Sequence, residues 1–345
     1  LEALMGHDDQ GEVLAARAQV THFLRTRLAD DIVPESSRVV VLDAAMSLRT
    51  AFQALLESGA PAAPVWHARY NAYIGTLAIA DLVEILSHFA MATTDPRALY
   101  HALSTQTLFY WARLSAATAS GRSLSSIGTS APTTPPSALD LEMSGAAAVA
   151  VRHTDGSAAT VLGPNGCFAL ADDSLYKACC VLRDRAVSHV TILATNEMLA
   201  LTVMTHRAVL RFVQQHISRT EQSTALFDRS IAELRIGTFV ELVTVSYGDS
   251  VWRAVELMSQ RGISAVPVVD EHGMILDEYT RLDACQLLSI ESTASSSKGD
   301  LGGDAIGVEL TIGDSLRQNR QSAIQVCTCR RSDSLRLIFE RFELA

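Results

Sequence analysis

Two aspartates, Asp81 and Asp283, each begin an apolar helical pattern shortly after an apolar run. A carboxylate at such a position can accept hydrogen bonds from the free N–H groups of the first helical turn, which stabilises the helix. It can also accept both protons of a vicinal diol through charge-assisted hydrogen bonds. The residue types alone favour the capping role and leave a role in ligand binding open.

No motif that supports catalysis accompanies these carboxylates. The sequence has neither a Gly-x-x-x-x-Gly-Lys phosphate loop nor a Gly-x-Ser-x-Gly nucleophile turn. Its ten histidines form no metal-binding pair such as His-Glu-x-x-His. The adjacent carboxylates Asp30-Asp31 and Asp172-Asp173 diverge on extended backbone and fit turns or helix caps. We therefore expect a protein that is not an enzyme.

The composition of the chain indicates which kinds of partner and which cellular compartment to expect. The 345 residues carry 28 Lys and Arg against 38 Asp and Glu, a formal net charge of −10, which disfavours broad contact with nucleic acid or an anionic membrane. No stretch approaches the ~20 apolar residues of a membrane span. Six cysteines without Cys-x-x-Cys spacing, Cys327 and Cys329 among them on one strand-like run, indicate packed thiols of a reduced intracellular protein. We expect a cytoplasmic or nuclear protein.

The elements that must position the aspartates recur along the chain. A serine at a helix start is followed 17 residues later by a short apolar run, and 16 or 17 residues after that by a second apolar helix. The serines are Ser47, Ser174, Ser250 and Ser334, the runs are centred on Pro64, Thr191 and Pro267, and the second helices begin at Asp81, Ala208 and Asp283. With a leading strand, the predicted unit is strand–helix–strand–strand–helix, present three times. The fourth copy, from Ser334, is incomplete.

This unit resembles the CBS repeat, and the order of its motifs resembles the gamma regulatory subunit of the AMP-activated protein kinase family. The segments that carry the resemblance are 29–41, 62–66, 75–81, 204–207, 231–239 and 264–271. The resemblance implies an α/β fold of tandem CBS repeats paired into two Bateman modules, repeat 1 against repeat 2 and repeat 3 against the incomplete repeat 4.

The same resemblance divides the chain. We expect repeat 1 at 22–90, repeat 2 at 166–217, repeat 3 at 236–290 and a partial repeat 4 at 306–345. Residues 91–165 are expected to hold a helix and a Ser/Thr/Pro-rich insertion. Within it, 115–148 lacks any hydrophobic period and is typical of a flexible linker.

The resemblance also implies an adenine-nucleotide site between repeats, with Asp81 and Asp283 where the family places its ribose-binding aspartate. Ala208 replaces that aspartate in repeat 2, as in the family. The other candidates match polar positions of the family or supply positive charge for phosphates. The full candidate set is Asp81, Asp283, Thr280, Arg281, His206, Arg207, His189, Arg261 and Thr238.

The sequence departs from the family at three phosphate-binding arginines. Their positions hold Pro61, Ser188-His189 and Arg261-Gly262, so fork-shaped, permanently charged donors are missing there. Histidine replaces them poorly, since it is mostly neutral at pH 7.

The resulting hypothesis is a non-catalytic regulatory subunit of an AMP-activated-type kinase heterotrimer. Its partners would be a kinase catalytic subunit and a beta-type scaffold subunit, and its regulatory ligands AMP, ADP or ATP, with no catalytic cofactor. Two alternatives stay open. A scaffold that has lost nucleotide sensing is favoured by the missing arginines. A regulatory module of a metabolic enzyme or transporter suits the repeats but not segments 29–41 and 231–239.

Overall fold

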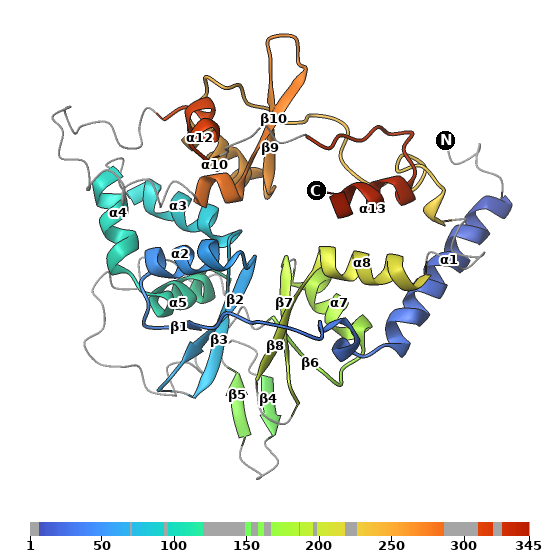
Figure 1. Ribbon diagram of the computed structural model, residues 1–345, viewed down its shortest axis with the longest axis horizontal. Coiled ribbons are helices and arrows are strands. Elements are labelled where there is room, and N and C mark those ends of the chain that lie inside the picture. Colours follow the sequence, from blue (N-terminus) through green and yellow to red (C-terminus); the bar gives the residue numbers. More distant parts are fainter. Residues whose placement is uncertain are drawn as a thin grey trace. The chain divides into compact units, whose positions relative to one another are not determined.

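The computed structural model describes residues 7–69, 71–92, 96–119, 149–152, 158–161, 167–185, 187–195, 199–217, 226–285, 310–319 and 326–344. They form two compact units, each built from segments that are distant in sequence (Figure 1). Unit 1 comprises Leu1–Val39, Cys167–Leu242 and Cys327–Ala345, and unit 2 comprises Val40–Gly166 and Val243–Val326. Unit 1 thus includes residues 167–217 of repeat 2 and 327–345 of repeat 4, and unit 2 includes residues 40–90 of repeat 1 and 243–290 of repeat 3. The expected pairing of repeat 1 with 2 and of 3 with 4 would join the two units and stays a prediction.

The sheets of repeats 1 and 2 share one topology. A short leading strand pairs parallel with the middle strand, which pairs antiparallel with the last strand. These strands are β1 (Leu42–Asp43), β2 (Ala62–His67) and β3 (Ala72–Ala78) in repeat 1, and β6 (Phe168–Leu170), β7 (His189–Leu193) and β8 (Ala200–Thr205) in repeat 2. Repeat 3 has antiparallel β9 (Ala265–Val269) and β10 (Ile275–Thr280), and Val245 bridges Val268 in parallel in place of a leading strand. The predicted strand order is confirmed.

Two sets of helices complete the repeats (Figure 1). The first helices follow the capping serines and are α2 (Leu48–Ser58), α7 (Leu175–Asp184), α10 (Val251–Arg261) and α13 (Leu335–Leu344). The second helices are α3 (Asp81–Ala92) and α8 (His206–Ile217). Helical residues 281–285 occupy the equivalent place in repeat 3, and residues 286–309 lie outside the described part of the chain. Further helices are α1 (His7–Thr26), the 3-10 helix η1 (Ala29–Ile32), which falls within the bounds expected for repeat 1, and α12 (Ile312–Asn319), which falls within those expected for repeat 4.

All four serines predicted as N-caps serve in that role. The hydroxyl oxygens of Ser47 and Ser174 accept hydrogen bonds from the N–H groups of Thr50 and Lys177, both at 3.2 Å. Ser250 and Ser334 cap α10 and α13 in the same way. Each hydroxyl satisfies a backbone donor that the first helical turn leaves without a partner.

We expect Ser174→Ala to lower the free energy of unfolding by about 1 kcal/mol, because α7 loses its side-chain cap. Urea unfolding followed by circular dichroism measures this change. Ser174→Thr retains the capping oxygen and is the matched control. Equal losses in the two variants would show that the hydroxyl has no capping value.

Each unit packs the second helix of one repeat against the first helix of another. In unit 2, α3 packs against α10, and one hydrophobic core includes Leu82 and Ile85 of α3 together with Val255 and Met258 of α10. In unit 1, α8 packs against α13. The arrangement places the N-terminal turn of α3 beside repeat 3, where Asp283 lies.

The segment between repeats 1 and 2 is more structured than the sequence indicated. Where one helix was expected, its described residues include the helices α4 (Pro96–Thr105) and α5 (Leu108–Ala119) and a hairpin of β4 (Val149–Arg152) and β5 (Ala158–Val161). Leu48 donates its N–H to the carbonyl oxygen of Gln106, between the two helices, which ties them to repeat 1. Most of the predicted linker, 120–148, lies outside the described residues. In the described part of the chain, no helix has the length and apolar character needed to cross a membrane.

Candidate functional site

Asp81 and Asp283, predicted from two different repeats, lie on turns of unit 2 that contact each other. Asp81 is the first residue of α3, and Asp283 belongs to the helical turn that follows β10. Nη1 of Arg281 lies 3.4 Å from the carbonyl oxygen of Ala80, and Sγ of Cys285 lies 3.9 Å from that of Ile79. We call this group the aspartate cluster; it consists of Ile79, Ala80, Asp81, Thr280, Arg281, Asp283 and Cys285.

Asp283 is the most enclosed carboxylate of the aspartate cluster, with an exposed fraction of 4%. Its Oδ2 accepts hydrogen bonds from the N–H of Thr280 at 2.8 Å and from the Thr280 hydroxyl at 2.6 Å. The N–H of Asp283 in turn donates to that hydroxyl oxygen at 3.2 Å. These bonds fix the carboxylate and the hydroxyl in one orientation, and they also close the turn that begins the helix.

Asp81 has a similar turn but a different electrostatic setting. Its Oδ2 accepts a hydrogen bond from the N–H of Ala78 at 2.8 Å. Burial raises the pKa of Asp81 to about 7, with a further increase from the charge of Glu84, while the hydrogen bond from Ala78 and the charge of Arg281 oppose the increase. This carboxyl group therefore holds its proton to a much higher pH than an ordinary aspartate does.

Arg281 connects the two sides of the aspartate cluster. Its Nε donates to the carbonyl oxygen of Ile263, just after α10, and its Nη1 reaches Ala80, next to Asp81. Cys285 was missed by sequence reasoning, because its place in the cluster depends on the contact between repeats. Burial raises the pKa of the Cys285 thiol, and the charge of Asp283 adds to the effect, so the group is a neutral thiol at pH 7.

Repeat 2 retains the turn without the carboxylate. The N–H of Ala208 donates to the hydroxyl oxygen of Thr205 at 3.2 Å, as the N–H of Asp283 does to Thr280. The alignment of Ala208 with Asp283 is therefore confirmed at the level of local geometry, and this turn offers a diol no acidic side chain of its own.

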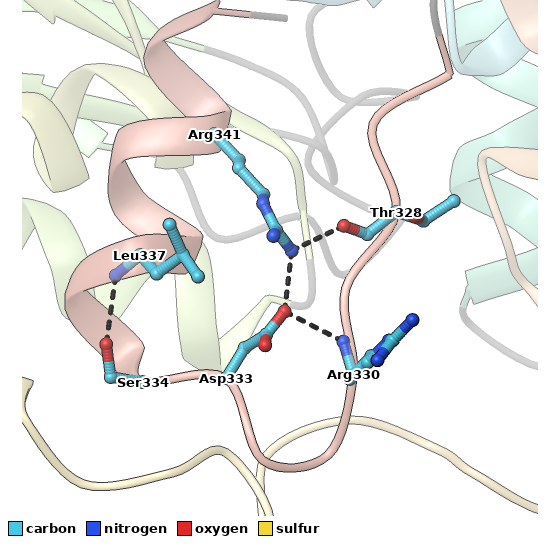
Figure 2. Close-up of polar contacts among 6 residues, drawn as sticks. All are labelled: Thr328, Arg330, Asp333, Ser334, Leu337 and Arg341. Carbon is cyan, nitrogen blue, oxygen red and sulfur yellow. Dashed lines mark hydrogen bonds and ion pairs between the residues drawn. The ribbon is translucent and has the colours of Figure 1, made fainter.

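Local hydrogen bonds do not by themselves separate capping from ligand binding. Asp173, Asp249 and Asp333, each just before a first helix, also accept a hydrogen bond from the N–H three residues earlier. In Figure 2, the carboxylate of Asp333 lies between the N–H of Arg330 and Nη1 of Arg341, at 2.9 and 2.6 Å. Asp81 and Asp283 differ from these three aspartates because the turns that carry them contact each other, so that residues of repeats 1 and 3 form one cluster.

The remaining candidates are divided between the units. Arg261, the last residue of α10, is exposed, as is Thr238 in an irregular segment of unit 1. His189 is buried at the start of β7 with Nδ1 3.1 Å from the Ser188 hydroxyl, and burial lowers the pKa of His189 to about 4. A neutral imidazole supplies no positive charge to a phosphate at pH 7.

His206 and Arg207, at the start of α8, are both exposed. Arg207 lines a groove in unit 1 together with Leu210, Arg211 and Gln214 of α8 and Phe339 and Phe342 of α13. The structure therefore assembles Asp81, Thr280, Arg281 and Asp283 into one cluster within unit 2. It places His189, His206, Arg207 and Thr238 in unit 1.

The residues that the structure describes give no support for metal binding, and their cysteines differ in exposure. They contain no group of three or more His, Cys, Asp or Glu side chains that could hold a metal ion. Cys167 and Cys285 are buried as expected, whereas Cys327 and Cys329 are exposed. The expectation of packed thiols is wrong for these two, because the extended segment that carries them pairs with no strand among the described residues.

Comparisons with known proteins agree with the predicted resemblance. The CBS domain profile matches residues 237–289. The gamma-3 subunit of 5'-AMP-activated protein kinase from Sus scrofa is 22% identical over 337 residues, which cover 98% of this chain and 54% of the relative. The Homo sapiens subunit is 23% identical over 338 residues, or 98% and 57% of the two chains. The chain thus spans about half the length of the curated relatives it matches.

One solved structure supports the fold. It is a Methanocaldococcus jannaschii protein described as an archaeal homologue of g-AMPK, with a TM-score of 0.59 and 14% sequence identity, and the match covers 91% of this chain and 88% of that one. The tandem CBS architecture and the resemblance to the gamma subunits are confirmed.

Proposed function

We propose that this relative of the AMP-activated protein kinase gamma subunits is a non-catalytic regulatory subunit of a kinase heterotrimer and binds adenine nucleotides at the aspartate cluster. Its partners would be a kinase catalytic subunit and a beta-type scaffold subunit. Similarity to gamma-3 subunits over 98% of the chain supports the regulatory class. The observation that carries the nucleotide site is the meeting of Asp81 and Asp283 in one cluster between repeats 1 and 3.

The chemistry of the aspartate cluster suits a nucleoside. A carboxylate accepts the protons of both ribose hydroxyls, and the Thr280 hydroxyl is held beside Asp283 at 2.6 Å. Arg281 is the one cation of the cluster as defined above, and it lies within reach of the same turns. Regulation further requires that a nucleotide bind two states of the assembly with different affinities.

A scaffold that has lost nucleotide sensing is the second candidate. It is favoured by the neutral state of His189 and by the exposure of Arg261, which leave these two positions without an enclosed phosphate-binding cation. The raised pKa of the Asp81 carboxyl group favours the nucleotide-binding subunit, since carboxyl groups with shifted pKa values are concentrated at functional sites.

Co-expression of the full-length protein with a kinase catalytic subunit and a beta-type subunit tests both candidates. The first candidate predicts a complex that purifies with 1:1:1 stoichiometry and whose kinase activity responds to AMP. The scaffold candidate predicts the same complex with activity that AMP leaves unchanged. Failure of the three chains to assemble would contradict both.

A further inference from the structure

The Arg281 guanidinium spans two repeats at a defined position. Nε is bound to the Ile263 carbonyl oxygen at 3.1 Å, in the segment between α10 and β9. Nη1 approaches the carbonyl oxygen of Ala80, the residue before Asp81, at 3.4 Å. The side chain is thus anchored in repeat 3 while its charge acts in repeat 1. Sequence reasoning treated Arg281 only as a candidate phosphate ligand.

We propose that Arg281 is a positioning residue for Asp81, so that ligand binding at Asp81 in repeat 1 depends on the contact with repeat 3. The proposal rests on the nucleotide-binding function proposed above. Arg281 acts in two ways: it fixes the turn that presents the Asp81 carboxyl group, and its positive charge favours the ionised form. The carboxyl group must be held in this orientation and must also be ionised in order to bind a diol. If repeat 3 moved away, Asp81 would lose a charge that keeps it competent for binding.

Two effects raise the pKa of Asp81 and two lower it. Burial raises it most, and the charge of Glu84, one turn along α3, adds to the increase. The hydrogen bond from the N–H of Ala78 lowers it, and the charge of Arg281 lowers it further. Of the neighbouring helices, α10 carries Arg253, Glu256 and Arg261, all at exposed positions, and His101 on α4 is exposed as well. Exposed charges are strongly screened by solvent. Among these groups, Arg281 is therefore the cation whose charge favours the ionised form of Asp81, in addition to the hydrogen bond from Ala78.

The ligand-free protein allows a direct test. The carboxyl carbon of Asp81, assigned in 13C-labelled protein by comparison with Asp81→Asn, reports its titration midpoint by NMR. We expect the midpoint to rise, by up to about one pH unit, in Arg281→Gln, because the positive charge that lowers the pKa of Asp81 has been removed. Arg281→Lys retains the charge and should stay near the wild-type midpoint. Arg253→Gln, which removes an exposed charge from α10, should not move it.

Adenosine, which has no phosphate group to titrate, is the binding probe. Its affinity for the wild-type protein should fall as the pH decreases from 8 to 6, and in Arg281→Gln this fall should move to higher pH together with the Asp81 midpoint. Arg281→Lys should restore the wild-type profile. An Asp81 midpoint that is the same in wild type and Arg281→Gln would overturn the proposal.

The two levels of the hypothesis can fail separately. If the midpoint moves as expected but adenosine binds no variant at any pH, the electrostatic link between Arg281 and Asp81 holds and the nucleotide-binding function is contradicted. If Arg281→Gln does not fold, the comparison of Arg281→Lys with wild type still tests whether the charge at position 281 acts on Asp81. A Lys variant whose Asp81 midpoint rises by about one pH unit and whose adenosine binding shifts with it, although the positive charge is retained, would contradict positioning by charge.

Discussion

Asp283→Ala is expected to weaken adenine-nucleotide binding by roughly 2–4 kcal/mol, or about 30- to 900-fold in dissociation constant. The variant removes a carboxylate that is 4% exposed and held in a single orientation by the Thr280 N–H and hydroxyl groups. Charge-assisted hydrogen bonds to ribose contribute about 1.5–3 kcal/mol each and are not additive. Titration calorimetry with AMP measures the change.

The same substitution also opens the turn before the helix, so its effect on stability needs a matched control. Asp249→Ala removes a carboxylate with the same local geometry, since Oδ2 of Asp249 accepts from the N–H of Ser246 at 2.7 Å and from its hydroxyl at 3.2 Å. Asp249 lies at the opposite end of α10 from Ile263 and outside the aspartate cluster. We expect both variants to lose stability, by roughly 0.5–2 kcal/mol, and only Asp283→Ala to lose affinity. Unchanged AMP affinity in folded Asp283→Ala would assign the residue to capping alone.

Asp81→Asn is expected to make the protein more stable than wild type at pH 8, by up to about 4 kcal/mol. Burial raises the pKa of Asp81 from 3.8 to about 7 in the folded protein. Between these values the folded state binds more protons than the unfolded state, so stability falls as the pH rises. The asparagine variant has no carboxyl group to ionise, so its free energy of unfolding does not fall with pH for this reason.

Urea unfolding at pH 5, 6, 7 and 8 follows this difference. Because the difference begins to build up near pH 3.8, the two proteins should already differ by roughly 1.5 kcal/mol at pH 5, diverge further as the pH rises towards 7, and stay apart above it. Glu84→Gln is the control, because it removes only the neighbouring repulsive charge and should reduce the slope slightly. A constant difference between Asp81→Asn and wild type at all four pH values would contradict the assigned electrostatics of this site.

The repeated elements could be predicted from sequence because they depend on local patterns. Ser47, Ser174, Ser250 and Ser334 are N-caps in the structure, as their positions before apolar helical periods indicated. The second helix of repeat 1 begins at Asp81, where the spacing placed it, and those of repeats 2 and 3 begin two residues before the predicted positions, at His206 and Arg281. The leading strand of repeat 3 was overestimated, because Val245 makes only one bridge to Val268.

The assembly of the site depends on contacts between distant segments, which no local pattern reveals. The resemblance selected Asp81 and Asp283 separately, but their meeting through Arg281 follows from the packing of α3 against α10. The charge state of His189 was equally hidden, since its burial in β7 depends on strands that pair across repeat 2. Residue type indicates which chemistry a side chain can perform, and tertiary packing decides whether it is ionised there.

Titration calorimetry of AMP against the full-length protein and its Asp81→Ala/Asp283→Ala double variant tests the central claim most directly. The account predicts saturable binding to wild type, retained in Asp249→Ala and lost in the double variant. Equal binding to wild type and to the folded double variant, or no binding to a wild-type protein that assembles with its kinase partners, would contradict a nucleotide site at the aspartate cluster.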